Sequence, residues 1–321
     1  MSKIPFCAEY FNTLRKFEDF RHCNPKATNK QVKDFYSDNK SEYVGNVAKP
    51  FEELSKSVHD TLNDIGFSEL IQTPSRGYLC EPFLQSDLKD DCWSIITPRG
   101  EGAKTTSPQL LIYTDTNRIE FGAFLGLYSS DNDAKKYHNG LKIIKRNDEV
   151  YSEFMKRINN SEFPFTQRCR KKESYLWLKS GRGIRKDGKI LNWGKLFNIE
   201  STYPFPFIPI ASNKSENLSL NELTDCITDA FTLVMPLFLA MSYGDNEDYL
   251  LKKMDNWLKI DAPKWNARLG INPYKFENKI SIPHNSSTFN LLGEHWYENS
   301  GKQVLLKDET NLFNILSSQY E

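Results

Sequence analysis

The amino-acid sequence predicts an α+β fold: a mostly antiparallel sheet with N-terminal helices before it and a C-terminal helical portion after it. Two observations predict this class. Apolar residues recur at helical spacing within residues 1–65 and 219–258, and short strands joined by tight turns lie between them. Hairpins need only short turns, whereas parallel strands need long crossovers, so the sheet is expected to be antiparallel.

The clearest N-terminal helix is expected over residues 47–65. Pro50 lies near its start, where a missing amide hydrogen is harmless, and Gly66 is suited to its C-cap. The apolar positions repeat every three or four residues: Val47, Phe51, Leu54, Val58, Leu62 and Ile65.

Strand patterns begin at Cys92. Trp93–Thr97 is short and apolar, and residues 109–114 and 118–128 form a hairpin that turns through 115–117. Gly122 in the second arm indicates sharp curvature, a bulge or close approach by another backbone or a ligand.

The second half of the chain alternates between the two element types. We expect one or two helices over 131–160, strands at 175–179 and 191–197 around an Asp-Gly turn, and an extended proline-rich connector at 203–209.

A strong helix is expected after Ser219, which forms a capping box with Glu222, and Pro236 should kink it. A helix at 246–258, short strands and a last helix near 308–319 complete the prediction. We expect the chain to have two parts. Residues 1–202 form a helical segment plus an antiparallel sheet with basic loops, and residues 203–321 form a helix-rich C-terminal portion. The boundary lies at 203–218, unless both parts pack as one domain.

Composition favours a cytoplasmic protein. The six cysteines form no CxxC or zinc-type cluster, the start MSKIPFCAEYF is not typical of a secretory signal, and free thiols fit a reducing compartment. The most apolar window, Phe231–Met241, is too short to span a bilayer, so we expect a buried helix and no membrane partner.

The charge distribution is the strongest functional signal. The whole chain has a formal net charge of zero, yet residues 142–195 hold fifteen Lys and Arg against six Asp and Glu. Such a local excess attracts polyanions, and aromatic residues among the cations suit bases or sugars. The alternative is that the run pairs with acidic segments such as 245–248 inside the fold.

The expected anion-binding residues are cations and two tryptophans. The loop at residues 180–189 combines glycines with guanidinium groups, and residues 98–102 have a similar Gly-Arg pattern. The full set is Arg99, Arg168, Arg170, Lys171, Lys172, Trp177, Arg182, Arg185, Lys186 and Trp193.

Catalytic patterns are sparse. The sequence contains no P-loop, no G-x-S-x-G and no H-E-x-x-H, and its five histidines show no metal spacing. Asp261 followed by Glu277 and Lys279 matches the D…E-x-K pattern of nucleases, in which two carboxylates hold Mg²⁺ and the lysine positions water. No cofactor is expected, except Mg²⁺ if the chain is such a nuclease.

Residues 35–65 carry Phe-Tyr-x-x-Asn-Lys-x-x-Tyr, then Val47, Pro50 and an amphipathic helix. This opening resembles a widespread bacterial family of uncharacterised proteins that begins W-F-x-x-N-K-x-x-Y…P. The later hairpin and the helix ending Val234-Met-Pro-Leu-Phe238 follow in similar order, so the resemblance covers 35–243. Residues 102–108, Gly-Ala-Lys-Thr-Thr-Ser-Pro, replace the family's R-F-S-x-x-K-x-P-Y-K run, and a shared activity is therefore not implied.

The hairpin at 109–128, with its preceding Gly-rich loop, is similar to the amino-terminal DNA-binding domain of McrB-type restriction proteins. That resemblance implies a component that recognises DNA while a partner subunit hydrolyses nucleotide or cuts. The leading expectation is therefore a nucleic-acid-binding component, with DNA as the partner, in a bacterial restriction or phage-defence system. The alternatives are a metal-dependent nuclease, an enzyme acting on a phosphorylated small molecule, and a protein-interaction module.

Overall fold

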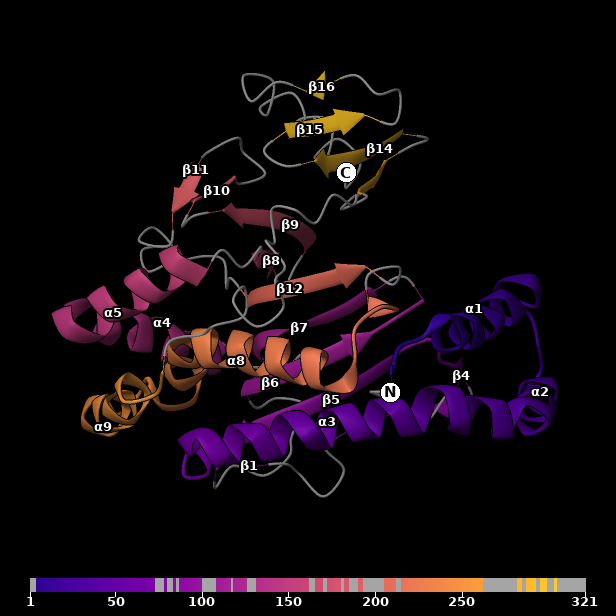
Figure 1. Ribbon diagram of the computed structural model, residues 1–321, viewed down its shortest axis with the longest axis horizontal. Coiled ribbons are helices and arrows are strands. Elements are labelled where there is room, and N and C mark those ends of the chain that lie inside the picture. The colour runs from indigo at the N-terminus through magenta and orange to yellow at the C-terminus, as the bar shows by residue number, and fades with distance from the viewer. Residues whose placement is uncertain are drawn as a thin grey trace. The chain divides into compact units, whose positions relative to one another are not determined.

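A computed structural model shows the fold of the chain (Figure 1). It divides into two compact units: unit 1 is residues 1–130 and 209–238, and unit 2 is residues 131–208 and 239–321. For the strands between 165 and 211 and between 282 and 304 the structure describes the backbone. The described residues are 4–72, 78–79, 83–84, 87–99, 108–116, 118–125, 131–161, 165–169, 172–179, 182–184, 190–192, 205–211, 215–261, 282–284, 287–292, 295–298 and 303–304.

Unit 1 opens with α-helices α1 (Ala8–Cys23), α2 (Asn29–Tyr43) and α3 (Lys49–Leu62), with π-helical turns at Val44–Ala48 and Asn63–Phe67. The Thr28 side chain caps α2 in a capping box with Gln31. As predicted, Pro50 lies in the first turn of α3. Gly66 has φ 111°, a left-handed conformation that suits glycine, inside the π-helical turn Asn63–Phe67 that follows α3.

Aromatic side chains hold these helices together. Phe6 makes an edge-on contact with Tyr10 at 4.4 Å between ring centroids, and Phe51 of α3 approaches the same ring of Phe6 at 6.3 Å. Phe20 of α1 stacks on Phe35 of α2 at 4.0 Å. Such contacts add to the area that the rings bury, and so they fix the helices against each other.

The sheet of unit 1 has the order β1 (Ile71–Gln72), β5 (Cys92–Pro98), β6 (Pro108–Thr114) and β7 (Arg118–Leu125), with β2 (Tyr78–Leu79) also paired to β5. A separate hairpin joins β3 (Phe83–Leu84) and β4 (Asp87–Leu88). The predicted hairpin is present as β6 and β7. Gly122 pairs with Leu111 within seven consecutive one-to-one pairs, so these pairs contain no bulge at that glycine.

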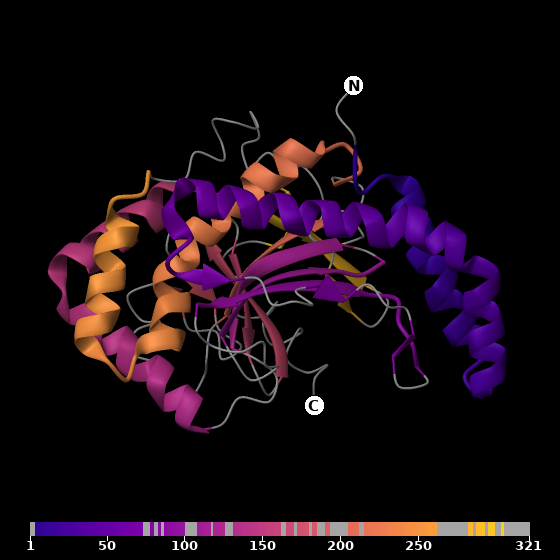
Figure 2. The same cartoon turned by 90° about the horizontal axis from the view of Figure 1, so that it is seen from below.

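Most residues of helix α8 (Leu220–Tyr243) are buried. Its predicted capping box is present: the Ser219 amide donates to Glu222 at 2.8 Å, and the Glu222 amide donates to the Ser219 hydroxyl at 3.3 Å. The first part of α8 and helix α3 lie on the same face of β5–β7 (Figure 2), and the Thr224 hydroxyl donates to that of Ser57 at 3.0 Å. Pro236 lies inside the helix, as expected.

Unit 2 gathers helices α4 (Asp131–Arg146), α5 (Asp148–Ser161) and α9 (Glu247–Leu258) beside the last part of α8 (Figure 1). Small residues bring α4 and α8 close together. A Cβ built on Gly140 would lie 2.6 Å from the carbonyl oxygen of Ala240, closer than real Cβ contacts. Gly244 similarly leaves no room for a side chain against the Lys136 carbonyl. The two backbones therefore touch directly.

The strands of unit 2 are also antiparallel. One group has the order β12 (Phe205–Ala211), β8 (Phe165–Cys169), β9 (Lys172–Lys179), β10 (Arg182–Ile184) and β11 (Ile190–Asn192). The second runs β13 (Ile282–His284), β14 (Ser287–Leu292), β15 (His295–Glu298) and β16 (Gln303–Val304). The α+β class with an antiparallel sheet is thus confirmed.

Some expectations differ from the structure. Residues 205–211 form strand β12 rather than a connector, because proline keeps an extended backbone and Pro206 can sit opposite Gln167 on β8. One boundary between the units, between residues 208 and 209, falls within the predicted 203–218, but residues 209–238 group with the N-terminal half and 131–208 with the C-terminal part. The helix expected at 308–319 lies outside the described residues. Cys7, Cys23, Cys92 and Cys226 are free thiols, as expected.

Candidate nucleic-acid interface

The basic strands of unit 2 bring two cations opposite each other. Lys179 ends β9 and Arg182 begins β10, and the register pairs them directly across the two-residue connection. Arg182 also pairs with Asn192 on β11. Like charges directly opposite each other in an antiparallel pair are destabilising, so this arrangement favours a bound anion that offsets the repulsion.

The neighbouring registers extend the same face of the sheet. Thr166 on β8 pairs with Trp177 on β9 and with Phe207 on β12, and Arg168 pairs with Phe205. Residues directly opposite share a face, and residues two apart in a strand share it as well. The register therefore places one set of residues on a common face, which we call the basic face: Arg168, Trp177, Lys179, Arg182, Phe205 and Phe207.

The opposite face has a different character. Leu176 and Leu178 alternate with Trp177 and Lys179 along β9, and Leu178 pairs with Phe165. This alternation is typical of an antiparallel sheet with one apolar and one polar face. Lys172 pairs with Cys169 beyond a register shift, so the alternation counted from Trp177 does not assign it to a face. Its role as an anion contact stays a prediction.

Arg99 has a local role in unit 1. Its guanidinium group donates to the carbonyl oxygen of Ser68 and lies 3.5 Å from the Glu69 carboxylate. Its own amide donates to Leu70 at 3.0 Å. Arg99 thus ties the end of β5 to the turn after the N-terminal helices. The other predicted anion contacts, Arg170, Lys171, Arg185, Lys186 and Trp193, lie outside the described residues and stay predictions.

The helical part of the basic run is largely paired within unit 2. Arg146 forms an ion pair with Glu247 at 3.1 Å, and Lys156 forms one with Glu153 at 3.2 Å. The alternative of internal pairing therefore holds for Arg146 and Lys156. The excess of positive charge that remains falls on residues 165–195, which hold ten Lys and Arg against two Asp and Glu.

Arg157 is the best-anchored cation of this helical part. Its side chain is 5% exposed, and its Nε donates to Glu153 at 2.8 Å while a terminal nitrogen donates to the Leu258 carbonyl at 3.2 Å. The guanidinium carbon lies 4.4 Å from the ring centroid of Trp257. Hydrogen bonds from Arg157 and then Lys156 lower the pKa of Glu153. Arg157 therefore joins α5 to α9 and is not available to a ligand.

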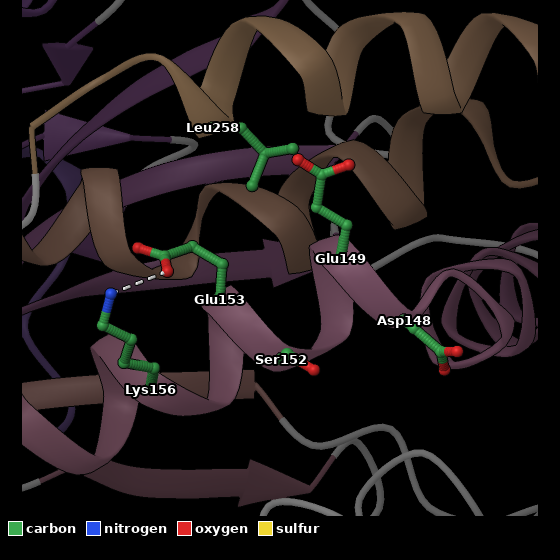
Figure 3. Close-up of a pocket in the computed structure, with 6 residues that line it drawn as sticks. All are labelled: Asp148, Glu149, Ser152, Glu153, Lys156 and Leu258. Carbon is green, nitrogen blue, oxygen red and sulfur yellow. Dashed lines mark hydrogen bonds and ion pairs between the residues drawn. The ribbon is translucent and has the colours of Figure 1, made fainter.

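A surface cavity of about 640 Å³ lies beside this cation. It is lined by Asp148, Glu149, Ser152, Glu153, Lys156 and Leu258. Figure 3 shows that Glu149 and Glu153 lie on the side of α5 nearest Leu258, and that Lys156 reaches back to Glu153. Because the lining residues include three carboxylates and one ammonium group, the cavity has the wrong charge for a polyanion.

Unit 1 contains an acidic group that the sequence did not indicate. Burial and the neighbouring Asp90 charge raise the pKa of the Asp91 carboxyl, although Lys89 and a hydrogen bond with Tyr113 act against the rise. Arg21 of α1 binds both oxygens of Asp90, at 2.9 and 3.1 Å. On the same side of the sheet, the fully buried Glu120 of β7 pairs with Tyr113 and lies 3.7 Å from Arg118.

The described residues only partly bear on the nuclease pattern. Asp261 is exposed just after α9, while Glu277 and Lys279 lie outside the described residues. Within the part of the chain that the structure describes, His, Cys, Asp and Glu side chains form no group of three that could hold a metal ion. The predicted Mg²⁺ site and the reaction that depends on it therefore stay predictions.

Comparison with known proteins found no family model that matches the sequence and no curated protein with significant similarity to it.

One helix of the described residues, α8, is long and apolar enough to cross a bilayer, with a mean hydropathy of 1.5. However, 94% of its apolar window is buried inside the fold, so the protein itself covers this surface. The buried helix expected at Phe231–Met241 is thus confirmed.

Proposed function

We propose that this chain binds DNA through the basic face of unit 2, as the recognition component of a bacterial restriction or phage-defence system in the cytoplasm. One observation carries the proposal: Lys179 and Arg182 pair directly on the face that also holds Arg168 and Trp177. A phosphate beside two such cations replaces repulsion with charge-assisted hydrogen bonds.

The distribution of charge favours a polymer over a small anion. Residues 165–195 carry ten Lys and Arg against two Asp and Glu, in a chain that is neutral overall. A single phosphate is bound by two or three donors, whereas a run of cations on several strands matches a ligand with many phosphates. Aromatic residues on the same face suit the bases of that polymer.

The biological setting rests on resemblance. The sequence of residues 109–128 resembles part of the McrB-type amino-terminal domains, which recognise DNA within a restriction system. In the proposed division of labour, a partner subunit supplies nucleotide hydrolysis or cleavage, and this chain supplies recognition. The sequence contains no P-loop, which fits that division.

The decisive experiment measures the affinity for a forked DNA, which contains both duplex and single-stranded arms, across a salt series. The test variant carries Lys179→Gln and Arg182→Gln. If each cation neutralises one phosphate, the slope of log K against log salt becomes less steep by roughly 1.4–1.8. The control variant carries Lys142→Gln and Lys252→Gln, which remove the same charge from exposed positions on α4 and α9.

The two variants separate a defined site from general charge attraction. The proposal expects a smaller salt slope and weaker binding in the test variant, with little change in the control. Equal losses in both variants would show that only net charge matters. Undetectable binding of the forked DNA by the wild-type chain at about 50 mM salt would reject nucleic-acid binding altogether. Tight binding of an acidic protein partner in its place would favour the interaction-module alternative.

A further inference from the structure

The basic face mixes cations and aromatic residues in a fixed order. Lys179 and Arg182 form one row across the sheet, and Trp177, two residues before Lys179 on β9, lies in a row with Thr166 and Phe207. Arg168 and Phe205 form a third row beyond it. Rows two residues apart are separated by about 7 Å, and neighbouring strands by about 4.8 Å.

This order places an aromatic row between two cationic rows. From Lys179 to Arg168 the backbone covers about 14 Å along the strands. A groove that binds a single strand combines backbone-tracking cations with aromatic rings on which successive bases stack. In a duplex the bases stack on one another, and their flat faces are not accessible to a ring on a sheet. The aromatic row therefore contributes only if the bases of the ligand are unpaired.

We infer that the basic face binds nucleic acid in single-stranded form, with phosphates at the rows of Lys179/Arg182 and Arg168 and an unpaired base on Trp177. The inference rests on the proposed function and specifies its ligand. The competing arrangement is a duplex whose major groove receives the two-stranded ribbon β10–β11, since that groove admits such a ribbon. In that arrangement the cations bind phosphates, and the ring of Trp177 contacts no base.

The test compares one mixed-sequence oligonucleotide as a single strand and as a blunt duplex, by fluorescence anisotropy at fixed salt. The wild-type chain is expected to bind the single strand more tightly. Trp177→Ala should weaken single-strand binding by about 5- to 150-fold, the range for loss of one base–aromatic stack, and leave duplex binding unchanged. Trp177→Phe keeps a planar ring and should restore most of the affinity.

Two controls guard against a simple loss of folding. Leu178→Ala truncates the adjacent residue of the same strand on the opposite face, and it should not change the preference for the single strand. An abasic single strand keeps every phosphate but has no bases. It should bind the wild-type chain weakly, and Trp177→Ala should not weaken it further, because the ring then has nothing to stack on.

The outcomes separate this inference from the proposed function. Equal or tighter binding of the duplex, with no selective effect of Trp177→Ala, would overturn the single-strand assignment while leaving nucleic-acid binding intact. A loss of affinity of the same size for the abasic strand would also overturn it. Failure of the wild-type chain to bind either form would overturn both.

Discussion

The close contact between α4 and α8 makes a sharp prediction for Gly140. Alanine normally favours a helix over glycine by about 1 kcal/mol. At Gly140, however, the added Cβ would lie 2.6 Å from the Ala240 carbonyl oxygen and 2.7 Å from its Cα. Backbone atoms cannot rotate away as a flexible side chain can, so the two helices must separate. Overpacking of this kind costs about 1–3 kcal/mol.

We therefore expect Gly140→Ala to lower the free energy of unfolding by roughly 1–2 kcal/mol after the gain in helix propensity. Gly45→Ala is the matched control, because a Cβ at Gly45 meets nothing within 4 Å. It should be neutral or stabilise the protein by up to about 1 kcal/mol. Urea-induced unfolding, followed by circular dichroism and by fluorescence, measures both changes. If the two substitutions shift stability in the same direction, the argument from backbone contact is refuted.

Three further substitutions test charges and caps. Hydrogen bonds with Ser219 lower the pKa of the Glu222 carboxyl in the folded protein. The stability that Glu222 contributes should therefore be fully present above about pH 4.5, and it should be lost as the pH falls through the lowered pKa. Urea unfolding of the wild type and Glu222→Gln at several pH values measures this contribution. Burial raises the pKa of Asp91, which means that its charged form is disfavoured in the folded protein. Asp91→Asn should therefore raise the free energy of unfolding at pH 7. This gain, measured by urea unfolding, should vanish near pH 4, where the carboxyl is protonated. Arg157→Lys should cost about 1–3 kcal/mol in thermal unfolding, because an ammonium group cannot reproduce both hydrogen bonds and the contact with Trp257; a change below about 0.5 kcal/mol would contradict that role.

The sequence predicted those elements whose signals are local. The capping box of Ser219 and Glu222, the proline at the start of α3 and the glycine after it are all present. The hairpin of β6 and β7 was also predictable, because a short polar turn separates two strand-like segments. Each of these signals acts over a few residues, and tertiary packing does not override it.

Other features depend on partners distant in the sequence. Residues 205–211 look like a connector until β8 provides a strand for them to pair with. Asp90 becomes a paired carboxylate only because Arg21, 69 residues earlier, lies beside it in the fold. Likewise, Arg157 looked like one more member of the basic run, and its burial against Trp257 is visible only in the structure. Non-local contacts of this kind leave no trace in residue spacing.

The basic run, residues 142–195, was recognised from the sequence, but its contacts are visible only in the structure. Counting charges correctly marked 142–195 as unusual, but the count could not distinguish cations that hold helices together from cations on strands. Arg146 and Lys156 pair with Glu247 and Glu153 inside unit 2. The pairing of Lys179 with Arg182 follows from the register of β9 and β10, which a count of charges does not contain.

The position of α8 in the chain has a consequence for synthesis. Unit 1 needs residues 209–238 as well as 1–130, and α8 supplies buried residues such as Leu223, Ile227 and Phe231. During synthesis, the apolar surfaces of unit 1 that α8 covers stay exposed until α8 has emerged from the ribosome. During this interval the nascent chain exposes strands β5–β7 as targets for chaperones. A fragment ending at residue 202 lacks α8 and would keep those surfaces exposed.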